Sequence, residues 1–219
     1  MEQHQQDNRA TIVLIHGIWM TGFDMSLLRY RLRRFGFNTC QFSYPTVRSD
    51  LIQNAQRLQR FVDTLHTDNH HADTIHYVAH SLGGLLLRQF FHDYPQQPPG
   101  RVVTLATPHQ GSQVARVLEN KRWAKCLLGK SLYHGLLGDV PPWTTDHELG
   151  VIAGRVSLGV GAMVTRLRGP NDGTVLVDET TLSGMTDYKL LPVSHAGMLL
   201  VPSVAREINS FLTTGKFLT

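Results

Sequence analysis

Residues 74–91 read Thr-Ile-His-Tyr-Val-Ala-His-Ser-Leu-Gly-Gly-Leu-Leu-Leu-Arg-Gln-Phe-Phe, and this stretch decides the fold. Its beginning is typical of a buried strand and its end of a helix, so Ser81 falls at the turn between them. A serine at such a turn is the sequence form of a nucleophile elbow, which lifts a hydroxyl above the sheet edge. The tight turn needs small residues two positions before and after the serine, and Ala79 and Gly83 meet this need.

Ser81 also has an alternative interpretation, because a serine directly before a helix can act simply as its N-cap. Short motifs predict a site only when their context supports them. The choice therefore depends on whether the rest of the chain supplies a base and an acid for this serine.

Apolar runs elsewhere in the chain of 219 residues repeat the alternation of strand and helix. Strands are expected at 11–15, 38–43, 74–78, 101–106, 151–157 and 187–192, and helices at 25–35, 51–65, 82–91 and 203–212. This order favours an α/β fold in which helices flank both faces of a mainly parallel central sheet. The length suits a single domain that spans residues 1–219.

The strand rhythm stops between residues 107 and 147, where apolar residues are punctuated by glycine and proline. We expect this segment to be a short helical, cap-like excursion within the domain, with an apolar face that covers a pocket. The sequence leaves open whether the excursion is a mobile lid or packs permanently on the sheet.

The balance of charges limits the classes of partner. The formal net charge is +4, and the basic residues are scattered rather than gathered in one tract. We therefore expect no nucleic-acid partner. One local group, Arg29, Arg31, Arg33 and Arg34, is interpreted as a solvated helix face, with contact to an anionic membrane surface as the alternative.

The chain shows no targeting or membrane-spanning pattern. Residues 1–10 are polar and lack the apolar core of a secretion signal, and no apolar run approaches the length of a membrane span. Cys40 and Cys126 are the two cysteines and suggest no disulfide framework. We expect a cytoplasmic protein with no integral membrane segment, and the sequence says nothing of its oligomeric state.

A base and an acid for the serine follow it in the chain. A serine hydroxyl needs a base to take its proton, and the base needs an acid to orient it. Asp172 lies in the turn-forming loop 169–175, and His195 follows the last strand-like run. We predict that Ser81, His195 and Asp172 form a catalytic triad, with Asp178 as the rival acid.

Negative charge that develops on a substrate oxygen needs hydrogen-bond donors. The backbone N–H groups of Leu82, just after the serine, and Ile18, just after the first strand, are the predicted donors. Gly17 lets the backbone turn inward beside Ile18. His16 is then better explained as a structural hydrogen-bonding residue than as a second base.

Taken together, the motifs resemble a known family. They are His16-Gly17-Ile18, Ala79-His80-Ser81-Leu82-Gly83-Gly84, Thr107-Pro108-His109-Gln110-Gly111-Ser112, Asn171-Asp172-Gly173-Thr174-Val175 and His195-Ala196-Gly197. Their combination and order resemble the α/β-hydrolase superfamily, specifically small bacterial lipase-like esterases. The resemblance implies an α/β-hydrolase fold and the triad above, and it places His109 close to the substrate. His16 and Trp19 are further candidates for substrate-proximal residues.

We therefore expect a serine hydrolase that cleaves carboxylic esters through an acyl-enzyme, with a small-molecule or lipid ester as substrate. Three alternatives stay open. An acyltransferase or thioesterase would use the same residues, a binding protein could keep the fold without the chemistry, and a hydrolase acting at a membrane surface would fit the arginine group.

No cofactor or metal is expected. His66, His70 and His71 are interpreted as part of a solvated loop, because no cysteine or glutamate completes a ligand pattern. Residues 124–131 fall short of a phosphate-binding loop, since Ala124 stands where glycine is needed and no strand precedes it.

Overall fold

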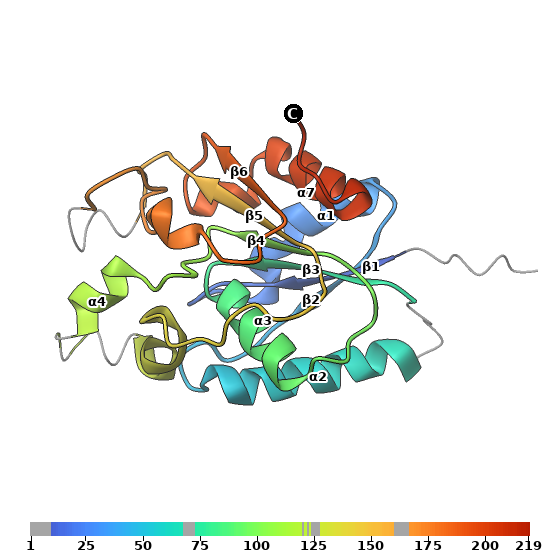
Figure 1. Cartoon of the computed structure of the whole chain (residues 1–219), viewed down its shortest axis with the longest axis horizontal. Helices are drawn as coiled ribbons and strands as arrows, with labels where there is room; N and C mark the ends of the chain where they lie inside the picture. The colour runs from blue at the N-terminus through green and yellow to red at the C-terminus, as the bar shows by residue number, and fades with distance from the viewer. Residues whose placement is uncertain (1–9, 68–72, 120, 122, 124–127, 160–166) are drawn as a thin grey trace, which may run out of the picture.

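The protein is built on a six-stranded parallel sheet with strand order β2-β1-β3-β4-β5-β6 (Figure 1). The computed structural model describes residues 10–67, 73–119, 121, 123, 128–159 and 167–219. The strands are β1 (Thr11–Ile15), β2 (Asn38–Phe42), β3 (Ile75–His80), β4 (Val102–Leu105), β5 (Leu149–Gly154) and β6 (Asp187–Leu191).

Helices cover both faces of this sheet (Figure 1). One face carries α1 (Ser26–Arg34) and α7 (Pro202–Thr214), and the other carries α2 (Leu51–Thr67) and α3 (Leu82–Asp93). Shorter segments are η1 (Gly22–Met25), α4 (Gln113–Glu119), η2 (Gly129–Ser131), η3 (Leu132–Leu136), η4 (Asp178–Thr180) and η5 (Ala196–Leu199). The two-sided covering confirms the α/β architecture expected from the strand rhythm.

The residues of β1 explain why both faces need a cover. Ile12 and Leu14 pack in the core under α1 and α7, whereas Val13 and Ile15 pack in the core under α2 and α3. All four side chains are fully buried. A strand with apolar side chains on both sides is stable in a parallel sheet only when helices exclude water from both.

Element boundaries differ from the sequence expectation at two places that matter for function. The expected strand 74–78 continues to His80, so Ser81 follows the sheet without any loop. The expected strand 151–157 has the wrong bounds, because β5 begins at Leu149 and ends at Gly154. Pairing decides this boundary, since Leu149 lies opposite Val102 at the start of β4.

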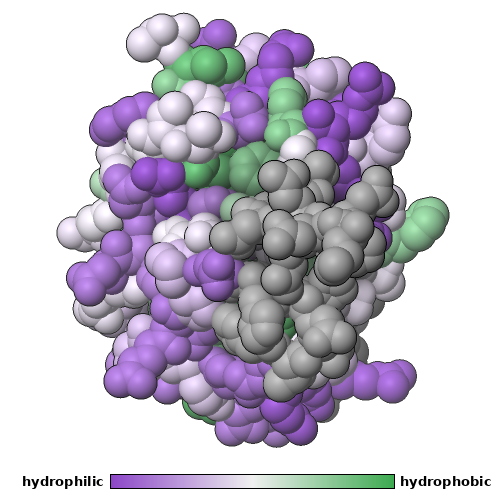
Figure 2. Space-filling view, turned by 90° about the vertical axis from the view of Figure 1, so that its right-hand side faces the viewer, coloured by the Kyte–Doolittle hydropathy of each residue, from purple (hydrophilic) through white to green (hydrophobic). Residues whose placement is uncertain are grey.

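Helix α4 of the excursion lies beyond the carboxyl ends of the strands (Figure 1), whereas residues 144–147 at the end of the excursion lie at the amino ends. The opposite edge, at the amino ends of the strands, faces the viewer in Figure 2, where mostly hydrophilic side chains surround a small hydrophobic area. Within the described ranges, no helix combines the length and apolarity that crossing a membrane requires.

The packing of α7 makes a testable prediction. Phe211 is fully buried and its ring lies 5.0 Å from that of Phe217. Phe211→Ala should lower the free energy of unfolding by about 3–5 kcal/mol, because it leaves a cavity under the helix. Phe23 is 82% exposed, so Phe23→Ala is the matched control and should change stability by less than about 0.5 kcal/mol. Urea unfolding measures both, and equal effects would contradict the assigned core.

Candidate active site

Ser81 lies at a strained turn between β3 and α3. Its backbone has φ 53° and ψ −121°, a region that residues other than glycine rarely adopt. The Ser81 N–H donates to the Leu105 carbonyl (2.8 Å), and the Ser81 carbonyl accepts from the Thr107 hydroxyl (2.9 Å). Its side chain makes no capping hydrogen bond to α3, so the structure does not support the N-cap interpretation.

Two glycines allow the backbone to come close at this turn. A Cβ atom at Gly83 would lie 2.8 Å from the His16 carbonyl oxygen, at the end of β1. A Cβ atom at Gly17 would lie 3.0 Å from the Ser81 Cβ. The contact at Gly83 is shorter than real Cβ atoms make, and the contact at Gly17 is tighter than most, so both positions favour glycine.

His195 and Asp172 contact each other directly. The His195 Nδ1 atom lies 2.7 Å from Asp172 Oδ2, and the His195 backbone N–H donates to the Asp172 carbonyl (2.9 Å). The other carboxylate oxygen, Oδ1, accepts the N–H groups of Thr174 (2.9 Å) and Val175 (2.7 Å). The carboxylate is buried, whereas the imidazole is partly open to solvent. A carboxylate held in this way fixes the orientation of the imidazole.

His80 connects this pair to the serine. Burial, and to a smaller degree the neighbouring His195, lowers the pKa of His80 well below its usual range. The neutral ring uses Nε2–H to donate to the His195 carbonyl (3.2 Å), and the two rings lie 4.7 Å apart. Since His80 precedes Ser81 in the chain, His195 is brought to the end of β3. Within the described residues, no hydrogen bond joins the Ser81 hydroxyl to the His195 imidazole. In enzymes without bound substrate, the hydrogen bond between nucleophile and base is often long.

Two backbone N–H groups border the same place. Leu82 is the first residue of α3, so its N–H has no acceptor within the helix. Ile18 follows the turn at Gly17, and its N–H has no acceptor among the residues that the structure describes. Both groups can therefore donate to an added oxygen atom.

A small apolar cavity of about 70 Å³ opens beside the serine. It is lined by Ile18, Trp19, Ser81, Pro108, Ser112, Val114, Ala115, Leu118, Leu128, Leu136, Thr174 and Val175. Several of these apolar residues come from the excursion, and Thr174 and Val175 come from the loop of Asp172. The cavity therefore meets the serine on one side and the acid loop on the other.

Three residues that the sequence suggested for the site, His16, His109 and Asp178, do not line this cavity. Burial lowers the pKa of His16. Its ring nitrogens contact the Gly17 carbonyl (2.9 Å) and the Tyr44 N–H (3.2 Å). His109 is buried with its Nε2 atom 3.1 Å from the Thr104 hydroxyl. Neither histidine lines the cavity, whereas Trp19 does. The rival acid Asp178 is exposed at the start of η4, and the His195 ring contacts Asp172 instead.

Two buried charged residues, which sequence reasoning did not single out, hold the excursion in place. Arg88 of α3 donates to the carbonyls of His109 (2.6 Å), Val140 (2.9 Å) and Pro141 (2.8 Å). Glu179 accepts the N–H groups of Gln113 (2.5 Å) and Leu176 (3.0 Å), and burial raises its pKa. In the sequence, Arg88 could have been noticed as a charged residue within the apolar run of α3. Glu179 stands in no comparable pattern.

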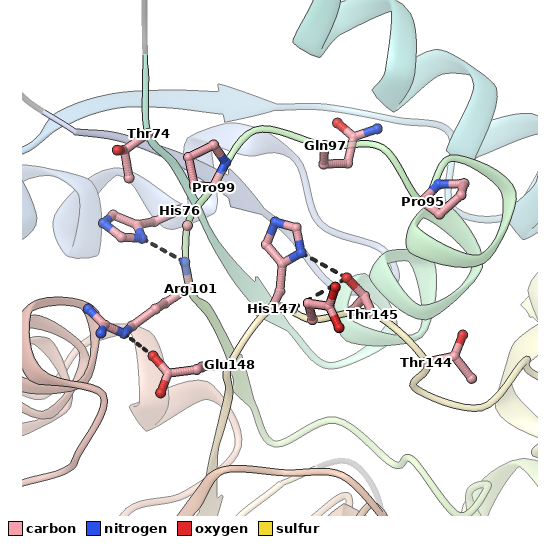
Figure 3. A pocket seen from close by; sticks show the side chains of 12 residues that line it. Thr74, His76, Pro95, Gln97, Pro99, Arg101, Thr144, Thr145, His147 and Glu148 are labelled. Atoms are coloured by element: carbon pink, nitrogen blue, oxygen red, sulfur yellow. Dashed lines mark hydrogen bonds and ion pairs between the residues drawn. The ribbon is translucent and has the colours of Figure 1, made fainter.

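A larger cavity of about 650 Å³ lies at the opposite edge, at the amino ends of β3, β4 and β5 (Figure 3). Some of its polar side chains pair with one another: Arg101 with Glu148 (2.5 Å) and His147 with Thr145 (2.8 Å). His76 accepts the backbone N–H of Arg101 (2.8 Å). Its distance from Ser81 along the strands separates it from the candidate active site.

No group of three or more metal-ligating side chains occurs in the portion that the structure describes. His70 and His71 of the histidine group and residues 124–127 of the loop-like run lie outside it, as does Cys126. Cys40 is a free, half-buried thiol.

Comparison with known proteins identifies the family. The family model described as "Putative serine esterase (DUF676)" matches residues 5–139, which is more than half of the chain. The chain therefore belongs to this serine esterase family. No curated protein matches the sequence.

Solved structures share the fold at low sequence identity. The mature lipase BlEst2 of Bacillus licheniformis has a TM-score of 0.76 and 18% identity, over 96% of this chain and 93% of that one. A lipase-esterase related protein from Clostridium acetobutylicum has a TM-score of 0.65 and 13% identity, over 94% and 96%. Phospholipase PlaB from Legionella pneumophila has a TM-score of 0.66 and 16% identity, over 86% and 52%. These likenesses confirm the α/β-hydrolase fold.

Buried histidines couple the stability of this fold to pH. Burial, aided by nearby arginines, lowers the pKa of His109 to about 3 and that of His76 to about 4. Both are therefore neutral in the folded chain at pH 5, whereas an unfolded histidine has a pKa of about 6.5 and takes up a proton. The unfolded state binds more protons, so the free energy of unfolding falls as the pH drops below about 6.5.

We expect His109→Gln to lose part of this pH dependence. Between pH 6.5 and 5, the variant should show a slope smaller by up to about 1.4 kcal/mol per pH unit, because one histidine that resists protonation is gone. Urea unfolding at pH 7, 6 and 5 measures the slope. The exposed His92 provides the control His92→Gln, which should keep the slope of the unmodified chain. An unchanged slope in His109→Gln would contradict the assignment.

Proposed function

We propose that this member of the serine esterase family hydrolyses carboxylic esters through an acyl-enzyme, with Ser81 as nucleophile, His195 as base and Asp172 as the orienting acid. The observation that carries the proposal is the 2.7 Å contact of His195 Nδ1 with Asp172 Oδ2, at the end of the strand that presents Ser81. The strained turn at Ser81 supports it, because such strain is concentrated at functional sites.

The contact with Asp172 decides which proton His195 can accept. The carboxylate accepts Nδ1–H, which leaves Nε2 unprotonated and available as a base. Nε2 removes the Ser81 hydroxyl proton while Oγ forms a bond to the ester carbonyl carbon. Asp172 then stabilises the positive charge on the ring. Its other oxygen is already held by Thr174 and Val175, so the carboxylate does not need to reorganise during the step.

The carbonyl oxygen becomes negatively charged during this attack. The N–H groups of Ile18 and Leu82 are the proposed donors to it, since neither is used within the described fold. When the tetrahedral intermediate collapses, the bond to the alcohol oxygen breaks and His195 gives its proton to the leaving alcohol. A water molecule then repeats the sequence on the acyl-enzyme and releases the carboxylic acid.

The cavity beside Ser81 supports an uncharged acyl group. Its lining is mostly apolar, and Leu118, Leu128 and Leu136 of the excursion contribute to it. An apolar pocket of this kind excludes a charged group, which would lose its hydration without gaining a partner. Because the cavity is only about 70 Å³, short acyl chains fit it without rearrangement of the excursion.

We expect Ser81→Ala to lower kcat for p-nitrophenyl butyrate by at least about 1,000-fold, because no other group can form the acyl-enzyme. The exposed Ser183 provides the matched control, and Ser183→Ala should keep full activity. A serine-reactive phosphonate should label the unmodified chain and not Ser81→Ala. Full activity of purified Ser81→Ala would overturn the assignment, and an unlabelled native chain would indicate a binding protein.

The choice of acid is tested separately. Asp172→Asn keeps the shape of the side chain but removes the charge that stabilises the protonated imidazole, so kcat should fall by about 10⁴-fold. Asp178→Asn serves as the control and should change kcat by less than about twofold, because Asp178 does not contact His195. Steady-state kinetics on the same ester provide the measurement, and the reverse ranking would identify Asp178 as the acid.

A further inference from the structure

The helix α1 carries four arginines whose charge the described fold does not neutralise. Arg29 bonds to the neutral side chains of Thr39 (3.2 Å) and Gln41 (3.2 Å), and Arg31 bonds to the Leu200 carbonyl (2.6 Å). Among the described residues, none of the four pairs with a carboxylate. Asp24, the one carboxylate between residues 22 and 34, bonds instead to the Thr21 N–H (2.7 Å).

Three of the arginines surround one hollow. It has a volume of about 400 Å³ and is lined by Ser26, Arg29, Tyr30, Arg33 and Arg34. Arg34 lies 3.4 Å from the Tyr30 hydroxyl. Arginine side chains bind phosphate and carboxylate groups through several N–H donors at once. The hollow therefore matches an anionic group that comes from outside the protein.

Exposed apolar side chains lie beside these arginines. Phe23 is 82% exposed, and Leu27 and Tyr30 follow it at intervals of four and three residues, which places them on one side of η1 and α1. Leu200 is 56% exposed, and its carbonyl is held against α1 by Arg31. Large apolar side chains that gather on a surface mark an interaction site.

One exposed apolar side chain that precedes η1 also belongs to the candidate active site. Trp19 lies four residues before Phe23, is 53% exposed, and lines the cavity beside Ser81. Leu200 likewise lies only five residues after His195. Trp19 is thus both an exposed apolar side chain close to η1 in the sequence and part of the cavity lining.

We infer that this α1 face, formed by Trp19, Phe23, Leu27, Tyr30, Leu200 and the arginines of α1, docks on the surface of an anionic phospholipid bilayer. The arginines bind the lipid headgroups, and the aromatic and leucine side chains enter the interfacial layer. The phosphates of a nucleic acid would also bind the arginines, but a nucleic acid has no apolar layer that Phe23 and Leu27 could enter. Docking itself is independent of the catalytic assignment, whereas the delivery of lipid esters to Ser81 rests on the proposed function.

The test uses the full chain with Ser81→Ala, so that turnover cannot alter the vesicles. Co-sedimentation with phosphatidylcholine vesicles is compared with vesicles that also contain phosphatidylserine. We expect binding only to the anionic vesicles, weakened by added salt because the arginines act through charge. Equal binding to both kinds of vesicle, or to neither, would overturn the inference.

The arginines are tested by a charge-matched pair of variants. Arg33→Gln/Arg34→Gln should lower the affinity for anionic vesicles by about 25-fold, since each basic residue near the surface contributes about fivefold. The control Arg60→Gln/Arg155→Gln removes the same charge from exposed positions outside the α1 face and should weaken binding by less than about threefold. Equal losses in the two pairs would show a general effect of net charge and overturn the assigned surface.

The contribution of the apolar side chains to vesicle binding is measured separately. Phe23→Ser should reduce vesicle binding at low and high salt alike, because burial of the ring does not depend on charge. Leu218→Ser, at another exposed apolar position, should leave binding unchanged. If Phe23→Ser binds as the parent does, or if inorganic phosphate at constant ionic strength abolishes vesicle binding, the α1 face holds a free anion rather than a membrane and the inference fails.

Discussion

The strained backbone of Ser81 is the constraint on which the rest of the site depends. A non-glycine residue in this conformation costs about 1–3 kcal/mol, and such strain persists only where its surroundings impose it. The central strands impose it here: β3 ends at Ser81, Leu105 at the end of β4 accepts its N–H, and Thr107 donates to its carbonyl. Gly83 packs against the end of β1. The strain is thus held by fully buried strands, where local opening of the fold is least favourable.

The parallel arrangement of the strands explains why so many groups meet at one edge. Every strand ends on the same side, so the loops that carry Ile18, Ser81, Asp172 and His195 leave the sheet together. Buried Arg88 and Glu179 then connect this edge to the excursion. A buried charge is tolerated only with partners, and backbone groups at both ends of the excursion and at the loop after Asp172 provide them. Arg88 therefore connects α3 to both ends of the excursion, and Glu179 connects the excursion to the loop after Asp172.

Much of this arrangement could be predicted because it follows from local rules. Alternating apolar runs predicted the strands and helices, and the small residues around Ser81 predicted the turn. The sequence predicted less well those strand bounds and side-chain contacts that depend on residues distant in the chain. The start of β5 at Leu149 depends on pairing with β4. The bonding of His16 to Tyr44, and of His109 to Thr104, depends on neighbours that periodicity cannot reveal. Both buried side chains bond within the protein, as the sequence suggested for His16, whereas the resemblance placed His109 close to the substrate.

The sequence by itself determined the order of strands and helices, the position of the serine between them, and the presence of an acid and a histidine further along the chain. These features follow from hydrophobic period and turn chemistry, which act over a few residues. Only the tertiary structure decided that Asp172 rather than Asp178 contacts His195, that His80 holds His195 beside the end of β3, and that Trp19 lines the cavity beside Ser81. Each of these contacts requires side chains from separate elements to meet, and only the packing of those elements on the sheet brings them together.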